Sequence, residues 1–167
     1  MIFVTVGTQG QFNRLIRTID EWAGVRGRTD VFAQTGPSDY RARHIRVERF
    51  IDPSEFRRCV ESASLVVAHA GMGSIITALE LGKQIIVMPR RAELGEHRND
   101  HQVASARRFA QQGRIVVALD EKELVERLDR VGSAETAERL GGQASSHLID
   151  TIRMFIDAEH TRAENRT

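Results

Sequence analysis

The sequence has little cysteine and no excess of either charge. Cys59 is the only cysteine among 167 residues, so no disulfide can form within the chain, which favours a reducing compartment. Lysine and arginine number 24 against 23 acidic residues. A nucleic-acid-binding domain typically has a basic excess, so we expect no nucleic-acid partner.

Long apolar runs are also missing. None approaches the roughly 18 residues that a transmembrane helix needs, and the apolar start at residues 1–6 is too short for a signal peptide. Hydrophobic residues still make up 41% of the chain, which is enough for a packed core. We expect a cytoplasmic chain with one domain over residues 1–160 and a frayed tail at 161–167.

Short apolar runs alternate with segments of helical spacing. The strands are predicted at residues 2–6, 29–35, 45–50, 65–68, 85–88 and 115–117. The helices are predicted to begin near residues 12, 53, 74, 100, 121 and 134, the last running to about 158. This alternation predicts an α/β fold, a Rossmann-like parallel sheet of about six strands with helices on both faces.

Glycines and capping residues indicate where these helices start and stop. Gly24 and Gly27 are expected to end the first helix, and Gly82 to close the third as a left-handed cap. Asp52 before a proline suits the N-cap of the second helix. Ser74 could cap the third helix or bind a phosphate oxygen.

The first loop suited to a ligand is Gly7-Thr8-Gln9-Gly10, between the first strand and the first helix. Its glycines let the backbone turn sharply and approach a ligand. The helix that follows offers free N–H groups and a positive dipole end, which suit phosphate. The motif alone is equally compatible with a strand–helix turn that binds nothing.

The second loop repeats this pattern after the fourth strand. It contains His69, Gly71, Met72, Gly73 and Ser74. The histidine alone could simply bond a neighbouring loop, but two glycine turns at two strand ends of one sheet favour a diphosphate. It is not a Walker loop, because no Gly-Lys-Ser/Thr follows.

A third, polar loop opens the helix near residue 100. Its candidate residues are Arg90, Arg91, His97, Asp100, His101 and Gln102. The two arginines suit phosphate, and the last three suit sugar hydroxyls; a solvated loop with a helix cap is the alternative. The two histidines lie four residues apart but straddle a helix start without a zincin pattern, so we predict no metal site.

In this order the three loops resemble the carboxyl-terminal, donor-binding domain of family 28 glycosyltransferases, which is one half of a GT-B enzyme. The resemblance covers residues 1 to about 128, and residues 69–102 look most like stand-alone PssE-like subunits of bacterial exopolysaccharide assembly. A second stand-alone group is Alg13-like, the small subunit of the transferase that adds the second N-acetylglucosamine to dolichol-linked sugar.

The resemblance implies roles for matching positions. Residues 7–10 and 69–74 would face the donor diphosphate, and residues 100–102 would contact the transferred sugar. Family members often carry a ribose-binding carboxylate where this chain has Thr77. Glu80 lies one helical turn further along the same face and could substitute, so the ribose contact stays open.

The resemblance further implies the donor-binding, catalytic subunit of a two-component, inverting hexosyltransferase in exopolysaccharide assembly. The substrates would be a UDP-sugar and a lipid-diphosphate-linked acceptor, with no cofactor. A membrane-associated, acceptor-binding partner (PssD-like or Alg14-like) would hold the chain at the inner face of the membrane. The helix at 134–158 could dock that partner or pack on its own sheet. We identify no catalytic base.

Two other functions are weighed. The chain could be a non-catalytic scaffold or regulatory subunit of such a complex, which the Thr77 departure keeps open. A dinucleotide-binding domain is less favoured, because Gly7 and Gly10 fall short of the Gly-x-Gly-x-x-Gly pattern. The second strand also ends at Gln34, where a dinucleotide site carries an acid.

Overall fold

The computed structural model describes residues 1–111 and 115–131, so the helix predicted at 134–158 lies outside the described residues. The strands are β1 (Ile2–Thr5), β2 (Val31–Gln34), β3 (Arg46–Glu48), β4 (Leu65–His69), β5 (Ile85–Met88) and β6 (Val116–Val117). The helices are α1 (Asn13–Arg26), α2 (Pro53–Ser62), α3 (Met72–Glu80), the 3-10 turn η1 (Ala92–Leu94), α4 (His101–Gln111) and α5 (Glu121–Val131). Among the described residues, no helix combines the length and apolarity needed to cross a bilayer.

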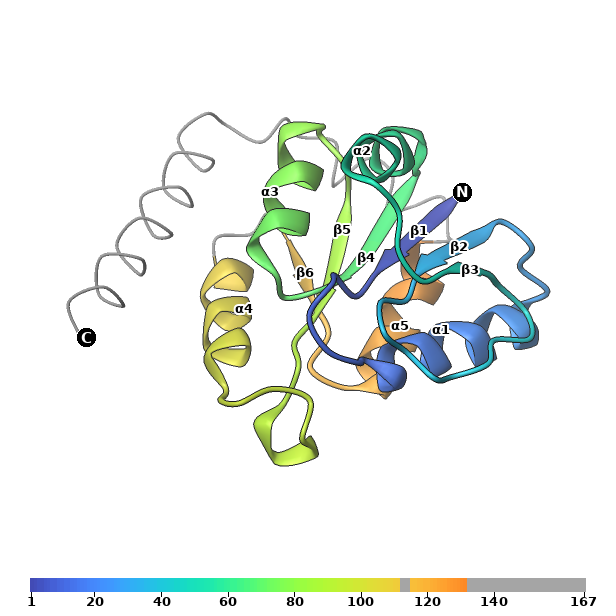
Figure 1. Ribbon diagram of the computed structural model, residues 1–167. Helices are drawn as coiled ribbons and strands as arrows, with labels where there is room; N and C mark the ends of the chain where they lie inside the picture. The colour runs from blue at the N-terminus through green and yellow to red at the C-terminus, as the bar shows by residue number, and fades with distance from the viewer. Residues whose placement is uncertain (112–114, 132–167) are drawn as a thin grey trace.

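The six strands form one parallel sheet in the order β3-β2-β1-β4-β5-β6 (Figure 1). Val4 of β1 pairs with Ala33 of β2 on one side and with Val67 of β4 on the other. The chain therefore leaves β1 in one direction through β2 and β3 and returns on the other side through β4. Ligands of such sheets bind at this switch point, outside the carboxyl ends of the strands. The predicted fold class is confirmed.

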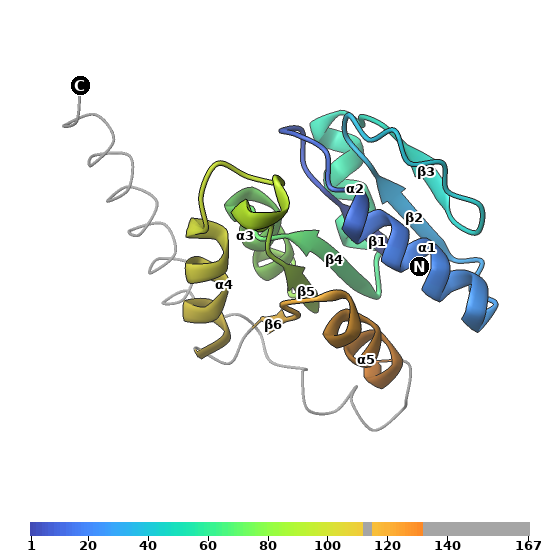
Figure 2. The same cartoon turned by 90° about the horizontal axis from the view of Figure 1, so that it is seen from below.

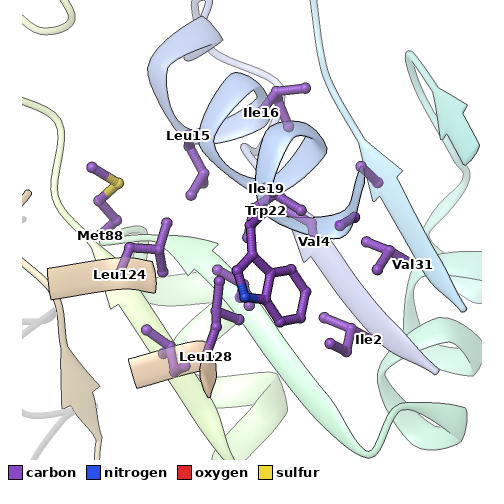
Figure 3. Packing of buried hydrophobic residues seen from close by; sticks show 14 of the residues in the cluster. Ile2, Val4, Leu15, Ile16, Ile19, Trp22, Val31, Met88, Leu124 and Leu128 are labelled. Carbon is purple, nitrogen blue, oxygen red and sulfur yellow. The ribbon is translucent and has the colours of Figure 1, made fainter. Parts of the chain in front are cut away.

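Helices cover both faces of the sheet (Figure 2). On one face, α1 and α5 pack on side chains of β1 and β2, with Leu15, Ile19 and Leu124 fully buried (Figure 3). On the other face, α2, α3 and α4 pack around Phe3 and Val66. The central strands are apolar on both sides for this reason, as a covered parallel sheet requires.

The end of α1 differs in part from the prediction. Gly27 takes the left-handed conformation of a C-cap, with φ of 62°, as predicted. Gly24 was expected to end the helix too, and this was wrong, because α1 continues to Arg26. A Cβ at Gly24 would lie 2.6 Å from the His44 ring. This glycine therefore makes room for a long-range contact that local spacing does not reveal.

The other helix ends follow their signals except at α3. Asp52 caps α2 by accepting from the N–H groups of Ser54 and Glu55, as predicted. Gly82 has φ of 62°, also as predicted. Ser74 is not the N-cap of α3, because the helix begins two residues earlier and Gly71 takes the cap position. A glycine there adopts the extended cap conformation readily, so Ser74 falls inside the first turn and is buried.

Candidate functional site

A cavity of about 580 Å³ opens at the carboxyl ends of β1 and β4, a size usual for small-molecule sites. Residues of all three loops singled out in the sequence line it. The lining residues from these loops are Gly7, Thr8, Gln9, His69, Ala70, Gly71, Met72, Gly73, Ser74, Arg90, His97, His101 and Gln102. Thr5, Gln34, Ile51, Pro53, Phe56 and Ser105 complete the wall. Among the residues that the structure describes, the wall thus contains a guanidinium and imidazole side chains but no carboxylate.

A buried arginine forms hydrogen bonds with the backbone of the first glycine turn. Gly7 and Gly10 both adopt positive φ, 73° and 75°, where side chains other than glycine are strained. The Arg90 guanidinium donates to the carbonyl oxygens of Val6 at 2.8 Å and Gly10 at 3.1 Å, and also to that of Gln9. Arg90 was predicted to face phosphate charge; the structure places its guanidinium against the loop backbone at one wall of the cavity.

A buried amide joins this turn to the neighbouring strands, and sequence reasoning missed its role. The Gln34 side chain donates from Nε2 to the carbonyl oxygens of Gly7 and Arg49, each at 3.0 Å. It accepts at 2.7 Å from the Thr5 hydroxyl, which itself accepts from the Gly7 N–H. The signal in the sequence was that a polar residue, Gln34, ends a buried strand. Gln34 fixes the glycine turn from the position at which a dinucleotide-binding fold carries an acidic residue.

The His69 imidazole lies between the two glycine turns. A Cβ added to Gly7 would meet its Cε1 at 2.7 Å, and one added to Gly71 would meet its Nε2 at 2.1 Å. Both positions therefore exclude any larger residue while this ring is in place. Burial, and next the Arg90 cation, lower the pKa of His69 to about 4, so the ring is neutral near pH 7. Its Nδ1 atom is buried without a hydrogen-bond partner among the described residues.

The second glycine turn leads directly into α3 at the cavity. Met72, Gly73 and Ser74 are its first three residues and all line the cavity. The first N–H groups of a helix have no partner within the helix and carry its positive dipole end. Nothing lies within 4 Å of a Cβ built on Gly73, so a side chain at this cavity-lining position would enter open space. Such a start is suited to an anion.

The third loop contributes two imidazoles and one amide. Gln102 is buried, and its Oε1 accepts from the Arg90 N–H at 3.1 Å. The rings of His97 and His101 meet edge to face with centroids 4.6 Å apart. Burial, and then the neighbouring imidazole, lower the pKa of His97. His101 and Gln102 thus reach the cavity, as their predicted sugar contact requires.

Two other residues predicted from this loop lie outside the cavity. Arg91 forms an ion pair with Glu93 at 2.5 Å. The Asp100 carboxylate accepts from the Ala92 N–H at 2.8 Å and so braces η1 before α4. The structure gives both residues partners within the loop itself, and their contact with a ligand stays a prediction.

The two ribose candidates on α3 are also outside the cavity wall. The Thr77 hydroxyl donates back to the Gly73 carbonyl oxygen of its own helix at 2.9 Å. Glu80 is exposed at the last residue of α3, one turn further from the cavity. The residue that would bind a ribose is therefore still open.

An ion pair that the sequence did not indicate locks the third loop to α1. Arg14 and Glu96 meet in two parallel contacts of 2.7 Å, and each side chain is only 11% exposed. Glu96 also accepts from the Arg91 N–H at 3.0 Å. The partners are 82 residues apart, so only the fold reveals the pair. It holds the loop that leads to His97 and His101, two of the histidines that line the cavity.

Within the described residues, no group of three His, Cys, Asp or Glu side chains is placed to hold a metal ion.

The comparisons with known proteins agree with the geometry of the cavity. A family profile described as the glycosyltransferase family 28 C-terminal domain matches residues 1–150. The chain belongs to this family. The resemblance drawn from the three loops is thereby confirmed. A comparison with curated protein sequences gives no match.

Solved structures show where this family 28 domain stands in the GT-B fold. The glycotransferase of kitacinnamycin superposes with a TM-score of 0.58 at 20% identity, covering 91% of this chain and 42% of that one. SnogD from Streptomyces nogalater gives 0.53 at 22% identity, covering 94% and 42%. The chain thus spans less than half of these two proteins. The NMR structure of ALG13 gives 0.56 at 17% identity, covering 87% of this chain and 96% of that one.

Proposed function

We propose that this family 28 domain is the donor-binding subunit of a UDP-sugar-dependent, inverting glycosyltransferase. The observation that carries the proposal is the cavity at the sheet's switch point, where residues 7–9 of the first glycine turn, the start of α3 and Gln102 line one space. Two backbone turns rich in N–H groups suit a diphosphate. The amide and imidazole of the third loop then suit the hydroxyls of the attached sugar.

The charges around the cavity support an anionic ligand. Arg90 is buried and its guanidinium stays protonated, although burial lowers its pKa. Its hydrogen-bond acceptors are neutral carbonyl oxygens, and within the described part of the chain no carboxylate lines the cavity wall. A bound diphosphate would supply the missing negative charge. The positive end of α3 adds to the same field.

The reaction proposed is direct displacement at the anomeric carbon. An acceptor hydroxyl attacks from the face opposite the diphosphate, the bond from carbon to the diphosphate oxygen breaks, and the configuration inverts. Helix N–H groups and the Arg90 cation stabilise the negative charge that develops on the departing UDP. A base must take the acceptor's proton. We assign that base to a partner, since no carboxylate among residues 1–111 and 115–131 lines the cavity.

The partner and acceptor are part of the same proposal. The chain spans 42% of the kitacinnamycin glycotransferase and therefore corresponds to one part of that protein, which leaves an acceptor-binding half to be assigned. We assign it to a membrane-associated, PssD-like or Alg14-like subunit. The acceptor would be lipid-diphosphate-linked, in bacterial exopolysaccharide assembly. The supporting observation is the PssE-like sequence of the second and third loops.

Calorimetric titration tests donor binding. UDP and UDP-glucose are titrated into the pure chain and into the chain co-purified with its partner. We expect saturable binding of UDP, and its loss in Gly71→Ala, because the new Cβ would lie 2.1 Å from the His69 ring. Gly73→Val would place a branched side chain in the open space beside Gly73 at the cavity wall and should also weaken the binding of UDP. Heat signals that stay at the level of dilution in both samples would refute the proposal.

A second pair of variants tests the sugar end of the cavity. His101→Ala and Gln102→Ala should leave UDP binding nearly unchanged but remove the additional affinity that the sugar gives. Thr77→Ala serves as the control, since its hydroxyl bonds only its own helix in the described structure. Equal losses for UDP and UDP-sugar in His101→Ala would contradict the assigned position of the sugar.

A non-catalytic scaffold is the second candidate function. The observation that favours it is the placement of Thr77 and Glu80 outside the cavity wall, so that no carboxylate of the described residues is placed to bind the ribose. A scaffold would stabilise its partner, and the transferase activity of the complex would be unchanged in the His101→Ala, Gln102→Ala double variant. The donor-binding proposal predicts a strong loss of that activity with the complex still assembled.

A further inference from the structure

The outer edge of the sheet carries a basic segment that the donor cavity does not use. This edge segment comprises residues 41–50, which include strand β3 and the turns on either side of it. Figure 2 shows β3 at one edge of the sheet, beside β2, in agreement with the strand order. Four arginines and one glutamate give the segment a formal charge of +3, whereas the whole chain carries +1.

The arginines of the edge segment are exposed and lack carboxylate partners within the part of the chain that the structure describes. These residues are Arg41, Arg43, Arg46 and Arg49. Arg46 lies over the Phe32 ring at 5.4 Å, and Arg49 donates to the Gly36 carbonyl oxygen at 3.5 Å. On α2, by contrast, Arg57 pairs with Glu61 in the usual surface arrangement. The edge arginines are therefore available to an external anion.

Two large apolar side chains stand among these arginines. Val47 is 42% exposed and Phe50 is 55% exposed. Phe50 is followed directly by Ile51, which lines the donor cavity. The edge segment thus runs directly to a residue of the cavity wall, at the carboxyl end of the sheet. Arginine and an exposed aromatic side by side suit the boundary between water and lipid headgroups.

A buried carboxylate holds the edge segment in place. Asp20 of α1 accepts hydrogen bonds from the N–H groups of Arg43 and His44 and from the Tyr40 hydroxyl. Burial alone would raise the pKa of Asp20, but these hydrogen bonds outweigh it and hold the pKa below its ordinary value. Gly24 leaves room for the His44 ring. The turn before β3 is therefore anchored at fixed points on α1.

We propose that the edge segment binds an anionic membrane surface directly. Guanidinium groups match phosphate well, and basic residues near an anionic leaflet each strengthen its attraction. A strand of three residues with an exposed charge offers little to a partner strand, so lipid phosphates fit the segment better than strand addition. This contact would place the mouth of the cavity close to the lipid surface. It is independent of donor binding and of the partner.

Vesicle sedimentation with the full chain tests the proposal. The probes are vesicles of phosphatidylcholine alone and of phosphatidylcholine mixed with phosphatidylglycerol. We expect binding only to the mixed vesicles, weakening as salt rises. The variant Arg43→Gln/Arg46→Gln/Arg49→Gln should partition about a hundredfold more weakly, which is ~2.8 kcal/mol at ~1.4 kcal/mol per tenfold change.

A matched control removes the same charge elsewhere. Arg57→Gln/Arg107→Gln/Arg127→Gln changes the net charge equally on α2, α4 and α5 and should keep most of the binding. Phe50→Ser should weaken binding without changing its salt dependence. The proposal is overturned if the wild-type chain does not bind the mixed vesicles, even if it binds an acidic protein instead. It is also overturned if the two triple variants lose vesicle binding equally. UDP titration of the edge variant should match wild type, because Arg43, Arg46 and Arg49 do not line the donor cavity, so this failure is separate from failure of the donor site.

Discussion

Replacing His69 by glutamine should change how the stability of the fold depends on pH. The imidazole lies between the Gly7 and Gly71 turns, next to the Arg90 cation. Burial and that cation lower its pKa from 6.5 to about 4. The unfolded chain therefore binds a proton at a pH where the folded chain does not. Glutamine has no such equilibrium.

The magnitude follows from the two pKa values of His69. Its contribution to stability is fully present above pH 6.5 and is lost as pH falls toward 4, because protons favour the unfolded chain over this interval. Between about pH 7.5 and about pH 5 the free energy of unfolding should fall by about 2 kcal/mol from this one group. The carboxyl groups of Asp20, Glu55 and Asp129 have pKa values below the ordinary 3.8 of aspartate or 4.5 of glutamate. They therefore titrate mostly below that pH interval.

Urea unfolding at these two pH values measures the effect. Trp22 is the only tryptophan and is buried at 6% exposure, so its fluorescence reports unfolding of the α1 face. Wild type should lose about 2 kcal/mol more than His69→Gln between about pH 7.5 and about pH 5. His97→Gln separates the second imidazole, whose pKa is also lowered. If wild type and His69→Gln lose the same free energy, the environment assigned to this ring is wrong.

Further predictions concern the turns and the buried ion pair. Gly71→Ala should lower the free energy of unfolding by about 1–3 kcal/mol, since its Cβ would overlap an imidazole nitrogen at 2.1 Å. Gly73→Ala has open space around the new Cβ, so it should leave the free energy of unfolding unchanged or raise it by up to about 1 kcal/mol. Glu96→Gln should cost about 3 kcal/mol because it leaves the buried Arg14 without its bidentate partner. Arg57→Gln, which breaks an exposed pair, should change less than about 1 kcal/mol. Urea denaturation compares all four; equal effects within either pair would contradict the structure.

The strands and their order of appearance were predictable because a covered parallel sheet needs continuous apolar runs. The run at residues 65–68, for example, became β4 with one added residue, His69. Helix ends were predictable where the cap is local, as at Asp52, which bonds N–H groups two and three residues ahead. They failed where a distant contact decides, as at Gly24, whose neighbour His44 lies on another segment.

The cavity was predictable as a place but only partly as a set of contacts. Two glycine turns ending neighbouring strands had to meet, because β1 and β4 pair in the sheet. Arg90 was expected to face phosphate, yet its bonds to carbonyl oxygens 80 to 84 residues away determine its direction. Such long-range hydrogen bonds, like those of Gln34, leave no periodic trace in the sequence.

The central claim is that the two glycine turns bind one diphosphate together. Titrating UDP into the ¹⁵N-labelled chain of 18.8 kDa and following backbone amide resonances tests this most directly. The amides of Gly7–Gly10 and of Gly71–Ser74 should shift together and fit a single dissociation constant. Shifts confined to one turn, or two turns that titrate with different constants, would contradict the claim.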